Sequence, residues 1–254
     1  MLPQVLGGIG LFLLGLHLMT DGLKSVAGDS LRNFLVRFAG GPVKAILFGA
    51  GATAVIQSSS ATTLMTIGLV SAGLLNLRQA VGLVMGANIG TTSTGWIVST
   101  LGFKMDLLAL ALPLVGIGAI AGIVGRGRVR QIGLVLAGFG LIFIGIDYLQ
   151  NGMKSLRGHF DPGMYMSDGP LALALLVVMG TVMTLIMQSS SAAVATTLAA
   201  LHSGTVDLVQ SAHLVIGHSI GTTITSAIAG LGATVVGKRT ALSHILLNAS
   251  TGFV

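Results

Sequence analysis

Apolar residues along this chain come in long runs that short polar or basic stretches separate. These runs cover about residues 4–20, 43–75, 79–102, 107–125, 131–149, 170–202, 206–232 and 240–254. Roughly 20 apolar residues in a helix cross the hydrocarbon core of a bilayer, so most runs predict one membrane-spanning helix. The runs 43–75 and 170–202 are too long for one crossing, and a glutamine followed by three serines interrupts each of them.

The chain is predicted to consist of two internal repeats, because four motifs recur in the same order at nearly constant spacing. The first two pairs are offset by 130 residues (138 − 8 and 152 − 22), and the last two by 131 (188 − 57 and 220 − 89). The pairs are G8-I-G-L-F-L-L-G15 with G138-F-G-L-I-F-I-G145, G22-L-K-S25 with G152-M-K-S155, Q57-S-S-S-A61 with Q188-S-S-S-A192, and I89-G-T-T92 with I220-G-T-T223. We expect a single transmembrane transport domain over 1–254, with repeat one at about 5–125 and repeat two at about 131–254, where the last helix is cut short.

The distribution of basic residues favours a particular topology. If the runs 43–75 and 170–202 each crossed once, both membrane faces would carry similar positive charge. If both runs are re-entrant hairpins, ten basic residues lie on one face and three on the other, which satisfies the positive-inside rule. The ten are Lys24, Arg32, Arg37, Lys44, Arg78, Arg126, Arg128, Arg130, Lys238 and Arg239, and the three are Lys104, Lys154 and Arg157. The predicted fold is therefore an all-α polytopic membrane protein with two inverted-topology repeats, each with a re-entrant helical hairpin carrying QSSS.

Composition agrees with a multi-pass protein of the plasma membrane. Only 8% of residues are charged, against about 25% in soluble domains, and the mean hydropathy is +0.93. The net charge of +6 does not indicate nucleic-acid binding, because the basic residues lie in short loops and form no basic face. We expect a first membrane helix rather than a cleaved signal peptide, since the first twenty residues lack a basic start and a small-residue cleavage site.

The two glutamine–serine segments are the principal candidate binding residues. At a broken helix, carbonyls and hydroxyls can replace the hydration shell of Na⁺, and the amides near Ala61 or Ala192 can face an anion. The alternative is that serine and threonine serve only in helix packing. Candidate ligands are Gln57, Ser58, Ser59, Ser60, Thr62, Thr63, Gln188, Ser189, Ser190 and Ser191, with Na⁺ expected at Gln57, Ser58, Ser59, Gln188, Ser189 and Ser190.

The segments G86-A-N-I-G-T-T92 and G217-H-S-I-G-T-T223 predict a second pair of unwound stretches lining the same cavity. The alternative is a close glycine contact between helices, with threonines bonded to their own helix. Candidate ligands here are Asn88, Thr91, Thr92, Ser219, Thr222 and Thr223.

Ionisable residues inside apolar segments are functional candidates. His218 falls within a predicted crossing, and His244 and Asn248 share one face of the last helix. Each histidine is either a proton relay or a hydrogen-bonded packing residue. His17 and Asp147 occupy equivalent positions and are interpreted as interfacial.

These residues resemble the type II sodium-dependent phosphate cotransporter family. The resemblance lies in Q57-S-S-S-A-T-T63, Q188-S-S-S-A-A193, the G-A-N-I-G-T-T segment and R239-T-A-L-S-H-I-L-L-N248. It implies Na⁺-coupled movement of inorganic phosphate, inverted repeats and a binding site at the QSSS turns, with Na⁺ as coupling ion and no other cofactor. The sequence departs from repeat equivalence at His218-Ser219, where the first repeat has Ala87-Asn88.

The predicted function is sodium-coupled phosphate symport by alternating access. A Na⁺-independent anion channel, a phosphate exporter and a membrane scaffold for another subunit are the alternatives. We predict no enzymatic activity, because no G-x-S-x-G, H-E-x-x-H or P-loop motif occurs. Preference among phosphate-like oxyanions, sodium stoichiometry, direction in the cell and homo-oligomer formation stay open.

Overall fold

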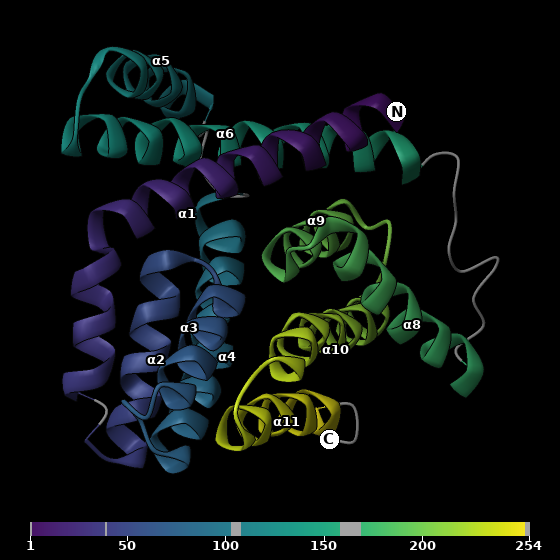
Figure 1. Ribbon diagram of the computed structural model, residues 1–254. Coiled ribbons are helices and arrows are strands. Elements are labelled where there is room, and N and C mark those ends of the chain that lie inside the picture. Colours follow the sequence, from purple (N-terminus) through teal and green to yellow (C-terminus); the bar gives the residue numbers. More distant parts are fainter. Residues whose placement is uncertain (1, 39, 103–107, 158–168, 252–254) are drawn as a thin grey trace. The chain divides into compact units, whose positions relative to one another are not determined.

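The computed structural model describes residues 2–38, 40–102, 108–157 and 169–251, with side chains described except at 27–38, 101–102 and 156–157. These residues form helices and no strands, as the apolar runs predicted (Figure 1). In order the elements are α1 (Leu2–Phe38), α2 (Pro42–Ile56), α3 (Ser59–Ser71), α4 (Leu77–Ile97), the π-helix η1 (Val98–Gly102), α5 (Leu108–Val124), α6 (Arg128–Arg157), α8 (Pro170–Met187), α9 (Ser190–Ser203), α10 (Leu208–Leu231) and α11 (Val235–Ser250).

The helices divide into two compact units that do not coincide with the two sequence repeats. Unit 1 contains Met1–Val26 and Gly95–His218, and unit 2 contains Ala27–Thr94 and Ser219–Val254. Each unit therefore takes residues from both repeats. The expectation of one transport domain over the whole chain stays a prediction.

Among the described helices, four are long and apolar enough to cross a membrane. They lie at Leu2–Val26, Arg128–Ser155, Pro170–Met187 and Leu208–Leu231. The α8 helix illustrates the pattern, because Leu171, Leu175, Val178, Val182 and Ile186 form an exposed apolar stripe at helical spacing. Such a stripe suits contact with lipid chains rather than with water.

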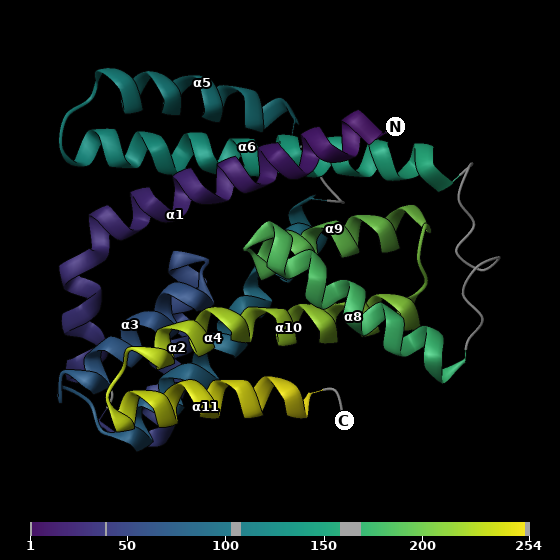
Figure 2. The ribbon, with the colours of Figure 1, turned by 45° about the vertical axis from the view of Figure 1, so that its right-hand side comes forward.

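In unit 1, helices α1 and α6 pack antiparallel through the glycines of the first repeated motif (Figure 2). A β-carbon on Gly8 would lie 2.9 Å from the carbonyl oxygen of Gly145, and one on Gly15 would lie 2.6 Å from that of Gly138. Gly138 is the repeat equivalent of Gly8, and Gly145 is the equivalent of Gly15. Exchanging the two repeats therefore converts one glycine contact into the other, so the two helices are related by a local two-fold axis.

The helices that carry the candidate motifs also pack in the same way in both repeats. In unit 2, a β-carbon on Gly49 of α2 would collide with the carbonyl oxygen of Leu83 in α4. In unit 1, a β-carbon on Gly180 of α8 would collide with that of Leu214 in α10. Both contact residues are offset by 131 (180 − 49 and 214 − 83), so glycine permits the same close approach of backbones in each repeat.

Capping residues explain why α4 and α10 begin where they do. The side chains of Asn76 and Gln79 bond each other's backbone amides, both at 2.9 Å. Asp207 and Gln210 repeat this arrangement at the start of α10, at 2.8 and 3.1 Å. Each pair is a reciprocal capping box that satisfies amides left free at a helix N-terminus.

Candidate ion-binding site

The helix is interrupted at both QSSS segments, as the sequence predicted. Helix α2 ends at Ile56, Gln57 adopts the left-handed conformation (φ 59°), and α3 begins at Ser59. Helix α8 ends at Met187, Gln188 is left-handed (φ 51°), and α9 begins at Ser190. Gln57 and Gln188 are the two non-glycine residues with positive φ in the described chain. That conformation costs a non-glycine residue about 1–2 kcal/mol, so finding it at matched positions marks both turns as specified features.

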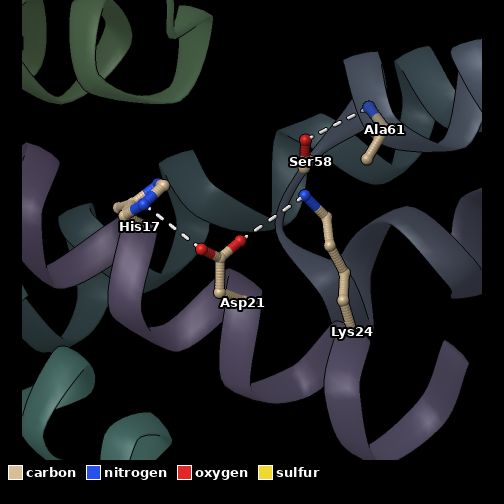
Figure 3. Close-up of polar contacts among 5 residues, drawn as sticks. All are labelled: His17, Asp21, Lys24, Ser58 and Ala61. Atoms are coloured by element: carbon tan, nitrogen blue, oxygen red, sulfur yellow. Dashed lines mark hydrogen bonds and ion pairs between the residues drawn. The ribbon is translucent and has the colours of Figure 1, made fainter.

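Ser58 and Ser189 cap the second helix of each pair. Ser58 Oγ accepts a hydrogen bond from the Ala61 amide at 3.2 Å (Figure 3). Ser189 Oγ likewise accepts one from the Ala192 amide at 3.2 Å. The serine caps thus occupy the amides of Ala61 and Ala192 themselves. The expectation that amides near these residues face an anion stays a prediction. Each capping hydroxyl keeps its own hydrogen for donation to a ligand.

The next serine in each turn has a hydroxyl without a partner. Among the described residues, neither Ser59 nor Ser190 makes a side-chain hydrogen bond. Ser59 is buried, and Ser190 is partly buried. Two equivalent hydroxyls at the start of a half-helix are therefore available to bind an ion.

Gln57 is fixed by two residues of α4 that the sequence reasoning missed. Its Nε2 donates to Ser93 Oγ at 3.0 Å, and its Oε1 accepts from Thr94 Oγ1 at 2.8 Å. Ser93 and Thr94 directly follow the candidate threonines Thr91 and Thr92, so the length of this polar run was the available signal. The contacts leave Oε1 one lone pair, which is suited to a hard cation.

Threonines tie the two helices of each pair together, in different ways in the two repeats. In unit 2, Thr53 Oγ1 of α2 donates to Thr62 Oγ1 of α3 at 3.0 Å. In unit 1, Thr184 of α8 and Thr197 of α9 both bond the imidazole of His218, at 3.2 and 2.9 Å. Sequence reasoning missed Thr53 and Thr184, although they are repeat equivalents (184 − 53 = 131).

His218 therefore fits the hydrogen-bonded packing alternative. It is 1% exposed, and its Nδ1 also lies 2.9 Å from the carbonyl oxygen of Gly180. The imidazole occupies the position of Ala87 in the first repeat and joins three helices of unit 1. The departure from repeat equivalence at this position thus has a structural reason.

The expectation of unwound stretches at residues 86–92 and 217–223 is wrong. Helices α4 and α10 run through both segments without interruption. The hydroxyl of Thr91 donates to Ala87 O at 3.0 Å, and those of Thr92 and Thr223 donate to carbonyls three residues earlier, both at 2.7 Å. The glycines there permit close contacts, since a β-carbon on Gly90 would lie 2.5 Å from Ala50 O. This is the glycine-contact alternative, in which threonine bonds its own helix.

Thr63 is a predicted ligand whose hydroxyl oxygen is completely buried and unsatisfied. It is fully buried, and its Oγ1 has no hydrogen-bond partner among the described residues. Thr62 differs, because its hydroxyl accepts from Thr53 and donates to the carbonyl of Ser58. Buried polar groups are rarely left without a partner, so Thr63 is consistent with a bound ion or water close to the first turn.

The structure brings together only part of the predicted ligand set. Unit 2 holds the first turn, Thr62 and Thr63, residues 88–92 of α4, and Ser219, Thr222 and Thr223 of α10. Unit 1 holds the second turn, Gln188–Ser191. The meeting of both turns in one cavity stays a prediction.

His17 belongs to an exposed ionic cluster on α1 rather than to the site. Its Nε2 lies 3.2 Å from an oxygen of Asp21, and Lys24 Nζ lies 3.8 Å from the other (Figure 3). The side chains of His17 and Asp21 are 71% and 51% exposed. Asp147, the repeat equivalent of His17, accepts a hydrogen bond from Asn151 at 3.1 Å.

These features define a class: a helical membrane protein with paired broken helices, of the kind that transporters use to bind ions. The chain belongs to the Na⁺/Pi-cotransporter family, whose profile matches residues 11–151 and 173–251. The family is thus a transporter family, in agreement with the resemblance carried by the QSSS segments.

Individual relatives carry different names. The chain is 32% identical to "Uncharacterized protein YqeW" of Bacillus subtilis, over 96% of this chain and 81% of that protein. It is 29% identical to "Putative inorganic phosphate export protein YjbB" of Salmonella typhimurium, over 96% of this chain and 44% of that protein. It is 34% identical to "Sodium-dependent phosphate transport protein 2A" of Rattus norvegicus, over 38% of this chain and 16% of that protein. The chain thus spans less than half the length of the YjbB and 2A proteins. No solved structure matches it.

Proposed function

We propose that this protein couples the entry of Na⁺ to the uptake of inorganic phosphate, by alternating access at the two QSSS turns. The observation that carries this proposal is the pair of helix breaks with matched geometry. Each has a left-handed glutamine, a capping serine and a following serine whose hydroxyl has no partner among the described residues. Half-helices that meet within a membrane are a recurrent way of binding ions in transporters.

The donor set suits a hard cation together with an oxyanion. Hydroxyl and amide oxygens, such as the spare lone pair of Gln57 Oε1, can replace water around Na⁺. The hydroxyl hydrogens of Ser58, Ser59, Ser189 and Ser190 can donate to phosphate oxygens. One turn can thus hold both ions, and bound Na⁺ supplies positive charge for the anion. We therefore expect the affinity for phosphate to rise with the Na⁺ concentration.

Electrical work explains why coupling would be needed. Moving a dianion inward against about 100 mV costs roughly 4.6 kcal/mol, at about 2.3 kcal/mol per charge. Two Na⁺ ions moving with it cancel this term. The concentration gradient of Na⁺ then drives phosphate uptake.

We also propose that the repeats have inverted topology. Helices α1 and α6 are repeat equivalents, and their glycine contacts run antiparallel with reciprocal pairing of Gly8 with Gly145 and Gly15 with Gly138. Both helices are long enough to cross a membrane. Equivalent spanning helices that point in opposite directions are what an inverted repeat requires. Re-entrant hairpins at α2–α3 and α8–α9 agree with this arrangement and with the distribution of basic residues.

The proposed topology places equivalent loops on opposite faces of the membrane. Residues 78 and 209 are exposed and occupy equivalent positions (209 − 78 = 131). Because the chain contains no cysteine, Arg78→Cys and Val209→Cys each introduce a single thiol. In intact cells, a membrane-impermeant maleimide should label Val209→Cys and not Arg78→Cys, and permeabilised cells should label both. Labelling of residue 78 from outside would refute the topology.

Flux measurements with purified protein in proteoliposomes test the coupling. An inward Na⁺ gradient should drive accumulation of ³²P-phosphate above its equilibrium level, and replacing Na⁺ with K⁺ should abolish this accumulation. Equal flux in Na⁺ and K⁺ would instead identify a Na⁺-independent channel.

Phosphate export is a second candidate function, because relatives covering 96% of this chain carry an export name. Flux measured in right-side-out and in inside-out membrane vesicles distinguishes phosphate export from phosphate uptake. An exporter would move phosphate from the cytoplasmic face without an inward Na⁺ gradient.

A further inference from the structure

Three helices of unit 2 are joined by a chain of polar side chains. It consists of Asn88 on α4, Ser226 on α10, and His244 and Asn248 on α11. Ser226 and His244 are 0% exposed, and Asn248 is 4% exposed. Asn88 is only partly buried. This hydrogen-bonded network thus runs from the interior of unit 2 to the side-chain amide of Asn88, which a ligand can reach.

The contacts fix the direction of every hydrogen bond. Asn88 Oδ1 lies 3.3 Å from His244 Nε2 and can only accept, so Nε2 must carry the hydrogen. The neutral imidazole then accepts at Nδ1, from Ser226 Oγ at 2.7 Å. Asn88 Nδ2 donates to Asn248 Oδ1 at 3.2 Å, and Asn248 Nδ2 donates to the carbonyl of His244 at 2.9 Å. A single imidazole tautomer therefore satisfies the whole network.

These hydrogen bonds leave one donor and one acceptor position of the Asn88 side chain unused. One Nδ2 hydrogen and one lone pair of Oδ1 have no partner among the described residues. Asn248 fixes the orientation of this amide: its Nδ2 donates to the His244 carbonyl, so its Oδ1 must accept from Asn88 Nδ2, which leaves Asn88 Oδ1 facing His244 Nε2. His244 and Asn248 together therefore choose which end of the amide remains for a ligand.

Asn88 lies on the helix that also fixes the first turn. Ser93 and Thr94, which hold the amide of Gln57, are five and six residues further along α4. At 1.5 Å per residue this separation is roughly 8–9 Å along the helix axis. Asn88 thus lies about one and a half helical turns of α4 from the residues that hold the first QSSS turn.

Helix packing alone does not explain this choice of residues. A fully buried imidazole is costly unless its nitrogens are hydrogen-bonded, and an apolar residue would join α10 to α11 without that cost. The network ends on a partly exposed amide rather than closing within the core.

We propose that His244, supported by Ser226, is a positioning residue that orients Asn88 so that its free N–H donates to the bound phosphate. This inference rests on the proposed phosphate transport. It goes beyond both alternatives raised for His244 from the sequence, since the imidazole neither relays a proton nor serves only in packing.

Kinetics of uptake in proteoliposomes test the positioning role. His244→Leu should raise the KM for phosphate about tenfold, with a maximal rate per folded protein within about twofold of wild type, since one ligand hydrogen bond is misplaced. His244→Gln should recover most of the affinity, because its Nε2 can still donate to Asn88. Ser226→Ala should raise KM in the same direction but less. Ser243→Ala is the matched control, because this neighbouring hydroxyl bonds only the Thr240 carbonyl of its own helix.

An unchanged KM in a folded His244→Leu protein would overturn the proposal, as would a His244→Gln protein no better than His244→Leu. If His244→Leu does not fold, Ser226→Ala decides in its place. The ¹⁵N NMR spectrum of histidine-labelled protein, with His244→Gln to assign the signal, gives a readout that does not depend on transport. The Nε2–H tautomer supports the proposal, and the Nδ1–H tautomer refutes it. Absence of Na⁺-dependent phosphate flux in the wild type would instead refute the proposed function.

Discussion

Alanine at Ser59 or Ser190 is expected to reduce Na⁺-dependent phosphate uptake by about 10- to 100-fold, the effect of losing one hydrogen bond to a charged ligand. Neither hydroxyl has a partner among the described residues, so its removal leaves no protein group unsatisfied. The caps belong to Ser58 and Ser189, and both helix starts are retained. The folded fraction should therefore match that of the wild type.

The measurement is initial ³²P-phosphate uptake into proteoliposomes, normalised to protein that elutes as a single species in size-exclusion chromatography. Ser250→Ala is the matched control, because this exposed hydroxyl bonds only Leu247 of its own helix. Ser58→Ala should differ from Ser59→Ala by lowering stability by about 1 kcal/mol through loss of the cap. Wild-type uptake in both the Ser59→Ala and the Ser190→Ala proteins would remove the two turns from the site.

Alanine at Gly49 is expected to destabilise the protein severely, whereas alanine at Gly51 of the same helix should be neutral or slightly stabilising. A β-carbon on Gly49 would collide with the backbone carbonyl of Leu83, which cannot move without separating α2 from α4. Overpacking of this kind costs about 1–3 kcal/mol or more. A β-carbon on Gly51 meets nothing within 4 Å, and alanine is the better helix former by up to about 1 kcal/mol.

Thermal denaturation followed by size-exclusion chromatography compares the two variants under the same conditions. Gly180→Ala should behave like Gly49→Ala, because it would collide with Leu214 in the equivalent contact. Equal midpoints for Gly49→Ala and Gly51→Ala would show that α2 and α4 do not approach as closely as described.

The glutamine–serine segments illustrate what local sequence can predict. Polar residues in the middle of an apolar run too long for one crossing indicated a break, and both breaks lie at Gln57 and Gln188. Segments 86–92 and 217–223 gave the opposite result. Glycine and threonine occur both in unwound helices and in close helix contacts, so the sequence does not distinguish the two cases. The structure does, because the carbonyl oxygens of Ile46, Ala50 and Val177 lie directly against the glycines of these segments.

By itself, the sequence determined the helical membrane class, the two repeats and the positions of the breaks, because hydrophobic length and motif spacing are properties of the chain alone. Tertiary structure decided how each polar side chain is used. Ser58 became a cap and Ser59 a free hydroxyl, although the two are adjacent and identical in type. His218 and His244 obtained their partners from other helices, at separations of 18 to 156 residues. A hydrogen bond depends on where both of its partners lie in space, and the order of residues does not specify that.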